Sequence, residues 1–294
     1  MPANREIEAL LMLADDPDDY IFNTVADKLI NYGREIIPKL EDVWERTEDT
    51  LLQERMELLI HRVYFNDLQG EFKAWNESDK HDILTGAILI AKYHYPDLNV
   101  PATLQQFDQI RRNIWLELNN YLTPLEQVNV INSIIYNFYK LEGHELTERN
   151  AQYFFINSVL ESKKGNAFSL GVLYLALCDV LDVPVFAVDI PRQFILAYFD
   201  TLYSFFSVNP SGIEQIQFYV DPIGGMAYTQ NDIDSYLKKI NATDGYKYFV
   251  RLSNRAVIQK MLEELRQCYR YQNQEGKANE IGQLITILSR NKKQ

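Results

Sequence analysis

The chain has 294 residues, of which 47% are hydrophobic and 24% are charged, and its formal net charge is −12. This composition is typical of a globular protein, and the length allows one large domain or two to three smaller ones. An acidic surface repels a phosphate backbone, so we expect no nucleic-acid partner.

Expectations about compartment and cofactors follow from features that the sequence lacks. Cys178 and Cys268 lie in apolar helical patterns, and their spacing fits neither a zinc motif nor a disulfide framework. Residues 1–8 are mostly polar and carry no apolar signal segment, and no apolar run reaches the ~18 residues of a membrane helix. We therefore predict a cytoplasmic protein in a reducing compartment, with no membrane association, no cofactor and no metal.

Residues 1–80 show apolar positions at helical spacing, interrupted by turn signals. The acidic turn Asp15–Asp19 lacks the spacing of a calcium-binding loop and is expected to cap a helix. Gly33 is expected to end the next helix, and Pro38 to open another. The same helical spacing of apolar residues recurs over Leu51–Trp75, and this favours a pair of HEAT-type hairpins. Because helical repeats usually come in three or more copies, an ordinary helical subdomain is the alternative.

The rest of the chain passes from helices to strands and back to helices. Helices are predicted at Ile83–Ala91, Phe107–Leu118, Val128–Phe138, Leu170–Leu181 and, in the tail, Val257–Leu288. Strands are predicted at Val185–Val188, Phe194–Phe199 and Ile216–Val220, with a turn at Asn209–Gly212. The basic end, Arg290, Lys292 and Lys293, is too short to be a nucleic-acid arm.

The predicted fold class is therefore α+β and predominantly helical. Its core is a central helix packed on a small antiparallel sheet, as in papain-type proteins. We predict a helical region at 1–80, the core with its leading helices at 81–245, and a C-terminal helical segment at 246–294.

A helix N-terminus followed by strands is the arrangement that builds a papain-type site. The nucleophile lies in the first turn of the helix, where unpaired N–H groups and the helix dipole favour a thiolate. The base comes from the next strand region, and a carboxylate or amide after it orients the base.

Several motifs in chain order resemble the SirB-one branch of the transglutaminase-like superfamily. They are Gly86–Ala91 with Tyr95–Asp97, Tyr153–Leu160, Gly165–Leu170, Val172–Leu175, Pro191–Phe194, Val220–Pro222 with Gly224–Gly225, and Met261–Leu265. The resemblance covers about residues 50–290 and is specific for the fold rather than for an activity.

The resemblance places Ser169 at the position of the catalytic cysteine, Gln193 at the histidine and Asp221 at the aspartate. Serine occurs at that position in the branch, whereas Gln193 departs from its Pro-Gly-His-Phe pattern. A serine hydroxyl needs a general base to attack at neutral pH, and glutamine cannot accept the proton. The four histidines all precede residue 145, so a base would have to come from the helical region. Each of the three residues also has a structural alternative: a polar first-turn position for Ser169, a backbone or Asp221 hydrogen bond for Gln193, and a strand-ending turn for Asp221.

Three functions are compatible with these residues. The favoured one is a non-catalytic protein whose old cleft near Ser169, Gln193 and Asp221 binds a ligand, with a protein or peptide as partner. The second is an atypical hydrolase or acyltransferase with Ser169 as nucleophile and Asp221 or an imported histidine as base. The third is a HEAT-like interaction module in which the core is a spacer. The oligomeric state stays open.

Overall fold

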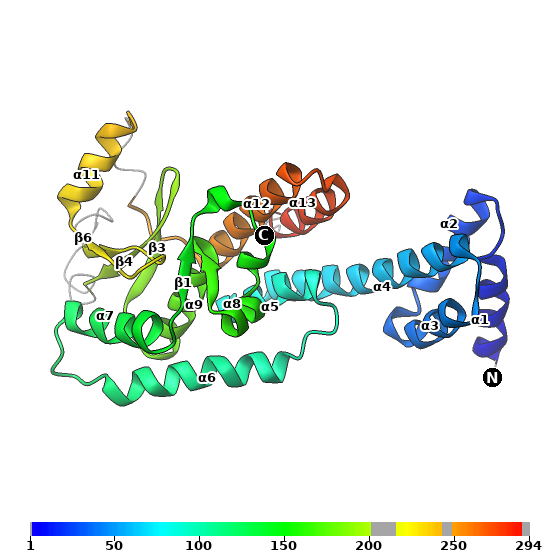
Figure 1. The fold of residues 1–294 in the computed structure, drawn as a ribbon, viewed down its shortest axis with the longest axis horizontal. Coiled ribbons are helices and arrows are strands. Elements are labelled where there is room, and N and C mark those ends of the chain that lie inside the picture. Colours follow the sequence, from blue (N-terminus) through cyan, green and yellow to red (C-terminus); the bar gives the residue numbers. More distant parts are fainter. Residues whose placement is uncertain (1, 201–215, 243–248, 290–294) are drawn as a thin grey trace. The chain divides into compact units, whose positions relative to one another are not determined.

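The computed structural model describes residues 2–200, 216–242 and 249–289 (Figure 1). The predicted turn Asn209–Gly212 and the basic end at 290–293 lie outside the described residues. The chain divides into two compact units, residues 1–74 and 75–294, which are taken in turn. The predicted three-part division after residues 80 and 245 stays a prediction.

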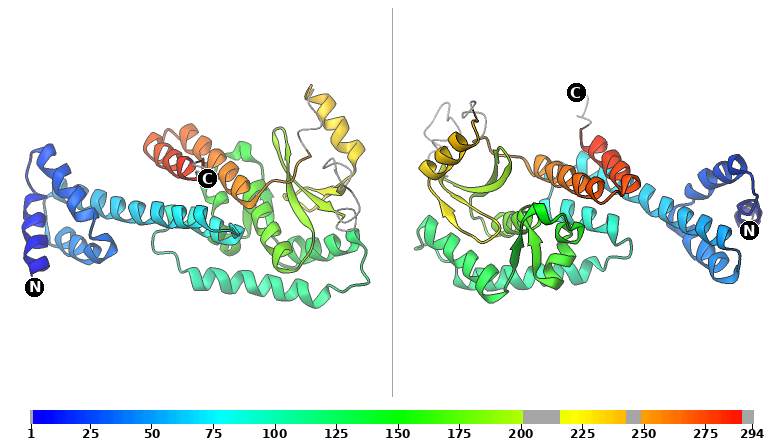
Figure 2. Two further views of the ribbon diagram at one scale, coloured as in Figure 1. Left: turned by 180° about the vertical axis from the view of Figure 1, so that it is seen from behind. Right: turned by 45° about the horizontal axis from the view of Figure 1, so that its top comes forward.

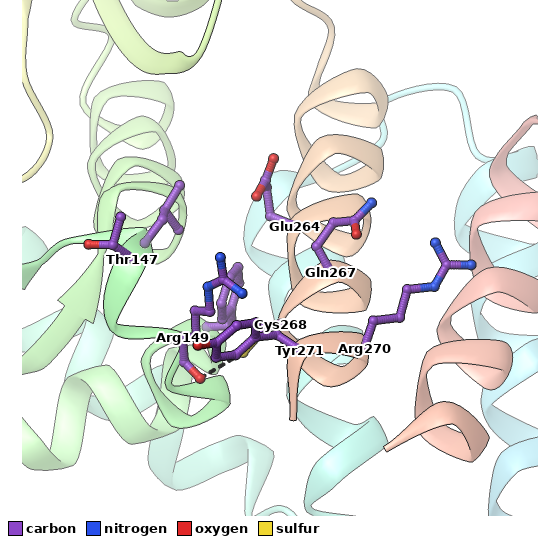
Figure 3. A pocket seen from close by; sticks show the side chains of 9 residues that line it. Thr147, Arg149, Glu264, Gln267, Cys268, Arg270 and Tyr271 are labelled. Atoms are coloured by element: carbon purple, nitrogen blue, oxygen red, sulfur yellow. Dashed lines mark hydrogen bonds between the residues drawn. The ribbon is translucent and has the colours of Figure 1, made fainter. Parts of the chain in front are cut away.

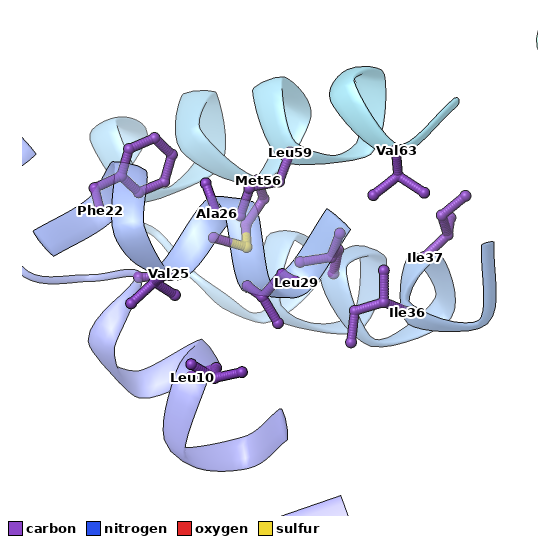
Figure 4. Packing of buried hydrophobic residues seen from close by; sticks show 12 residues of the cluster. Leu10, Phe22, Val25, Ala26, Leu29, Ile36, Ile37, Met56, Leu59 and Val63 are labelled. Atoms are coloured by element: carbon purple, nitrogen blue, oxygen red, sulfur yellow. The ribbon is translucent and has the colours of Figure 1, made fainter. Parts of the chain in front are cut away.

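The first unit consists of short helices whose boundaries follow from local side chains. Its elements are α1 (Pro2–Leu13), α2 (Asp19–Ile30), the 3₁₀ helix η1 (Gly33–Ile36), α3 (Ile37–Arg46) and the part of α4 (Thr50–Glu77) up to residue 74. Asp18 caps α2 by accepting a hydrogen bond from the Tyr20 N–H, and Gly33 follows that helix with a φ of 63°. Leu10, Phe22, Val25, Leu29, Met56 and Leu59 belong to one buried cluster (Figure 4).

The acidic turn before α2 has a structural use. The buried guanidinium of Arg55 donates hydrogen bonds to the Ala14 and Asp16 carbonyls, and it pairs with the Asp19 carboxylate at 3.2 Å. It also lies over the Phe22 ring, 4.7 Å from the centroid. The prediction that this turn caps a helix is confirmed, and whether the hairpins are of HEAT type stays a prediction.

The second unit carries helices on both sides of two small sheets. After the end of α4, its elements up to residue 166 are α5 (Ile83–His94), α6 (Val100–Glu117), α7 (Pro124–Asn132), the π-helix η2 (Ser133–Phe138), β1 (Glu142–His144), the 3₁₀ helices η3 (Leu146–Glu148) and η4 (Ala151–Phe154), α8 (Ile156–Ser162) and β2 (Lys164–Asn166). Those that follow are α9 (Ala167–Val180), β3 (Val185–Ile190), β4 (Gln193–Phe199), β5 (Ile216–Val220), β6 (Ala227–Tyr228), α11 (Gln230–Lys239), α12 (Asn254–Tyr271) and α13 (Glu275–Ser289). Both views in Figure 2 show α12 and α13 as a hairpin.

The central helix α9 is enclosed by the rest of this unit. Every residue from Ala167 to Cys178 is buried, because α9 packs against α5, α8, β3 and β4. Its apolar character on all faces suits such a position. Gly171 permits the closest approach of the sheet, since a Cβ there would lie 2.4 Å from the Phe194 ring. Burial raises the pKa of the Cys178 thiol, which is a core residue as expected.

The sheet beside α9 is antiparallel, with strand order β3-β4-β5-β6. β3 pairs with β4 from Val185 opposite Tyr198 to Ile190 opposite Gln193. A second, parallel pairing of β1 with β2 sets His144 opposite Asn166, the residue that precedes α9. The predicted α+β, mostly helical class is thus confirmed, with the short strands β1, β2 and β6 added. In the described part of the chain, no helix is both long and apolar enough to cross a membrane.

Candidate functional site

A cavity of about 350 Å³ opens at the N-terminus of α9, where the turns of the antiparallel sheet meet it. Five segments contribute to its wall: the residue after β1, the first residue of α9, the β3–β4 hairpin, the turn after β5, and the segment from β6 into α11. Its lining residues are Glu145, Ala167, Ile190, Gln193, Phe194, Ile195, Asp221, Ile223, Tyr228, Asp232, Ile233 and Tyr236. Two of the three predicted site residues, Gln193 and Asp221, are therefore brought together here.

Ser169 does not line this cavity, because its hydroxyl is used to cap α9. The Asn166 side chain accepts hydrogen bonds from the N–H groups of Phe168 (3.0 Å) and Ser169 (3.1 Å). In return, the Ser169 hydroxyl accepts from the Asn166 N–H at 3.0 Å and donates to the Tyr153 carbonyl at 2.6 Å. The residue has 0% exposed surface. This reciprocal capping box leaves the hydroxyl enclosed among backbone groups.

None of the hydrogen-bond partners of the Ser169 hydroxyl in the described structure is an imidazole. His144 lies opposite Asn166 in the β1–β2 pairing, and its ring stacks on Tyr153 with centroids 4.4 Å apart. Its Nδ1, however, lies 3.0 Å from both carboxylate oxygens of Glu148. The His144 imidazole is therefore oriented by a carboxylate rather than by a hydroxyl nucleophile.

Asp221 lies in the turn after β5 and is half-buried. One of its carboxylate oxygens accepts a hydrogen bond from the Ile223 N–H at 2.9 Å. Burial raises the pKa of this carboxyl, and the hydrogen bond partly offsets that effect. Among the described residues, Asp221 has no lysine or arginine partner, and no hydrogen bond joins it to Gln193. Gln193 is exposed at the start of β4.

The turn that carries Asp221 is fixed from the side of α7. The Asn132 amide donates to the Gly225 carbonyl and the Tyr136 hydroxyl donates to the Pro222 carbonyl, each at 2.7 Å. Gly225 has a φ of 73°, and a Cβ there would lie 2.5 Å from Asn132 Cγ. Tyr136 comes from the π-helix η2, an element that often occurs at functional sites. These contacts hold the Asp221 carboxylate at the cavity wall.

Ala167 is one of several lining residues that the sequence analysis did not single out. As the first residue of α9, it presents a methyl group to the cavity at the helix N-terminus. The signal was present in the sequence, because Asn166-x-x-Ser169 fits the spacing of a capping box and so predicts that the serine points back to the cap. The position of the first turn that lines the cavity is therefore two residues earlier than Ser169.

Among the described residues, the charged groups that line the cavity are all carboxylates: Glu145, Asp221 and Asp232. Asp232 is also engaged at the start of α11, where hydrogen bonds from the Thr229 hydroxyl and N–H lower the pKa of its carboxyl. The pKa of the Tyr228 phenol is raised by burial and by the negative charges of Asp221 and Asp232. The site therefore combines a negative potential with aromatic and aliphatic walls.

A larger groove of about 490 Å³ runs between α12 and the segment from Leu146 to Phe154 (Figure 3). It contains Arg149, Glu264, Cys268 and Tyr271 but none of the three predicted site residues. In the described residues, no group of three histidine, cysteine, aspartate or glutamate side chains is arranged to hold a metal ion. The cavity beside α9 is thus the candidate site, although it is the smaller of the two.

Comparison with known proteins identifies the family to which the chain belongs. The chain is 25% identical over 174 residues to the UPF0162 protein YchA of Escherichia coli K12, and equally to the protein of that name from Escherichia coli O157:H7. Each alignment covers 57% of this chain and 60% of the relative. No solved structure matches the chain. The sequence pattern described as "Transglutaminase-like superfamily" matches residues 101–263, which include the whole of α9 and the β3–β6 sheet. The chain therefore belongs to the transglutaminase-like superfamily.

Proposed function

We propose that this protein is a non-catalytic member of its superfamily, which binds a ligand in the cavity beside α9. The observation that carries the proposal is the chemistry of the lining. In the described residues, that lining contains no thiol, aliphatic hydroxyl, imidazole or amine. A nucleophile with an adjacent base is the minimum for covalent acyl transfer, and Ala167 and Gln193 supply neither.

The charge of the cavity favours a ligand that carries a cationic group on an apolar body. Asp221 is half-buried and has no basic partner among the described residues, so an ammonium or guanidinium group would supply the missing counter-charge. The rings of Phe194, Tyr228 and Tyr236 suit the apolar part and add cation–π attraction. A free amine, or a lysine or arginine side chain of a peptide or protein partner, has this chemistry.

Absence of catalysis is tested with peptide amide and ester substrates, with and without an amine acceptor. We expect no turnover above the uncatalysed rate, and no native-state labelling of Ser169 by an electrophilic serine probe. Turnover that disappears in both Gln193→Ala and Asp221→Asn variants would establish the atypical enzyme instead. Ser169→Ala is a poor single test, because the hydroxyl also caps α9.

Ligand binding is tested by calorimetric titration with benzylamine, with benzyl alcohol as its neutral counterpart. We expect the amine to bind about tenfold more tightly than the alcohol, which corresponds to about 1.4 kcal/mol. Asp221→Asn should remove that preference. Glu117→Gln is the matched control, because it removes one acidic charge at the exposed end of α6, away from the cavity lining. Equal binding of amine and alcohol by the unsubstituted protein would refute the cationic preference.

A further inference from the structure

The groove along α12 (Figure 3) has a chemistry opposite to that of the cavity. One wall is the segment from Leu146 to Phe154, and the other is the face of α12 that carries Glu264, Gln267 and Tyr271. The two hollows share no lining residue, and the chain passes from one to the other between Glu145 and Leu146. The groove thus forms a second place where a ligand can bind, independently of the proposed function.

Arg149 is held in this groove by three separate contacts. Its backbone is left-handed, with a φ of 51°, at the end of η3. Its carbonyl accepts hydrogen bonds from the Cys268 thiol (3.0 Å) and the Gln272 amide (2.7 Å), both on α12 or just after it. Its guanidinium carbon lies 3.3 Å from the centroid of the Tyr271 ring. The guanidinium is therefore positioned before any ligand arrives.

The guanidinium of Arg149 has no anionic partner in the described structure. No carboxylate lies within ion-pair distance, and no acceptor takes a hydrogen bond from its N–H groups. In contrast, Arg34, Arg55 and Arg111 each pair with a carboxylate. Figure 3 shows the guanidinium directed into the open space between Thr147 and Gln267.

We propose that the α12 groove binds a small organic anion, whose carboxylate or phosphate oxygens accept paired hydrogen bonds from the Arg149 guanidinium. A planar guanidinium with free N–H groups matches these anions in a two-point geometry that a lysine cannot reproduce. Thr147 and Gln267 supply further donors beside the same space, and Arg270 adds positive charge at the rim. Glu264 opposes binding from α12 through its negative charge.

The test is an NMR titration of the full chain labelled with ¹⁵N-arginine. The Arg149 Nε–H resonance is assigned by its loss in the Arg149→Lys variant. Sodium phosphate and sodium acetate are added separately, with sodium chloride at matched ionic strength as the reference. Arg192 is the internal control, because it is an exposed arginine with a similar left-handed φ of 62° that lines neither hollow.

We expect a saturable shift of the Arg149 resonance while Arg192 follows the chloride reference. The anion that saturates at lower concentration identifies the source as a phosphate or a carboxylate ligand. Arg149→Lys should weaken binding at least tenfold, measured by calorimetry with the same anion, and Glu264→Gln should tighten it severalfold. Shifts at Arg149 no larger than those at Arg192 with both anions would overturn the proposal, and so would an Arg149→Lys variant of unchanged affinity.

Discussion

Glu145 lines the cavity beside α9, and the next residue, Leu146, lines the groove along α12. The net charges of the side chains that line the two hollows are nevertheless opposite in sign. Among the described residues, the charged groups of the cavity are Glu145, Asp221 and Asp232, whereas those of the groove are Arg149, Arg270 and Glu264. A net charge of −12 therefore agrees in sign with the cavity but not with the groove. The comparison shows that ligand class has to be inferred from the charges that face each space, not from the sum over the chain.

The difference in charge can be measured directly with thiol reagents. In a background that carries Cys268→Ser, which removes the native thiol of the groove, Ala167→Cys places a thiol in the cavity and Thr147→Cys places one in the groove. Each variant is treated with a cationic and an anionic methanethiosulfonate. The cationic reagent should react faster at 167 and the anionic one faster at 147. We expect the two rate ratios to differ by roughly 100-fold, since electrostatic focusing changes each by about tenfold.

A cysteine introduced at position 169 is the control for this experiment, because that side chain is enclosed by the Asn166 and Tyr153 backbone. It should stay unmodified in the native protein. Rapid reaction at 169, or equal ratios at 147 and 167, would contradict the assignment of Ala167 to the cavity or the opposite charges of the two sites.

The difference between the two sites should be lost on the cavity side when the turn that carries Asp221 is disturbed. Gly225→Ala introduces a Cβ at a φ of 73° and at 2.5 Å from Asn132 Cγ, so we expect a loss of about 3 kcal/mol in the free energy of unfolding. Gly224→Ala is the matched control, because nothing lies within 4 Å of its Cβ, and it should change stability by less than about 0.5 kcal/mol. Urea denaturation measures both. Equal stabilities would show that the turn is not held by α7.

A smaller effect separates the structural role of Ser169 from a catalytic one. Ser169→Ala removes the acceptor of the Asn166 N–H and the donor to the Tyr153 carbonyl, so we expect about 2 kcal/mol of destabilisation in urea. Benzylamine affinity should be unchanged, because Ser169 does not line the cavity. A variant of full stability that loses benzylamine binding would reverse this assignment.

The smallest expected effect concerns pH. The pKa of Asp221 is raised in the folded protein, so the folded state holds this proton more tightly than the unfolded chain does. The corresponding stabilisation is present at low pH and is lost as the pH rises through the folded-state pKa, which lies above 3.8. Benzylamine binding should change in the other sense and strengthen over the same window, as the carboxylate forms. Calorimetric titrations at a series of pH values measure this trend, and an identical trend in Asp221→Asn would exclude Asp221 as its cause.

Much of the fold was predictable because the spacing of apolar residues indicates which residues of a helix or strand are buried. The helix over Leu170–Leu181 and the strands near Val185, Phe194 and Ile216 follow from apolar patterns that tertiary packing reinforces. The strands β1 and β2 were not predictable in this way, since Glu142–His144 and Lys164–Asn166 are short, polar and paired across a long sequence separation. Their pairing depends on tertiary contacts, and no local sequence pattern indicates it.

The candidate site was predictable in part. Gln193 and Asp221 were found because the resemblance places them at the histidine and the aspartate of a papain-type site, and the structure brings both to one cavity. The resemblance alone does not indicate whether Ser169 or Ala167 faces the cavity. Which of two residues in a helical turn faces a cavity depends on the rotation of the helix, and here the capping box sets it.

The enclosure of α9 separates the chemistry of this protein from its packing. From Phe168 to Cys178 the helix is surrounded, and Ala167 is the residue that it contributes to the cavity. A new side chain at that one position would lie at the wall of the cavity, in the field of a helix N-terminus. A new side chain at any position from Phe168 to Cys178 would have to fit into the packed core.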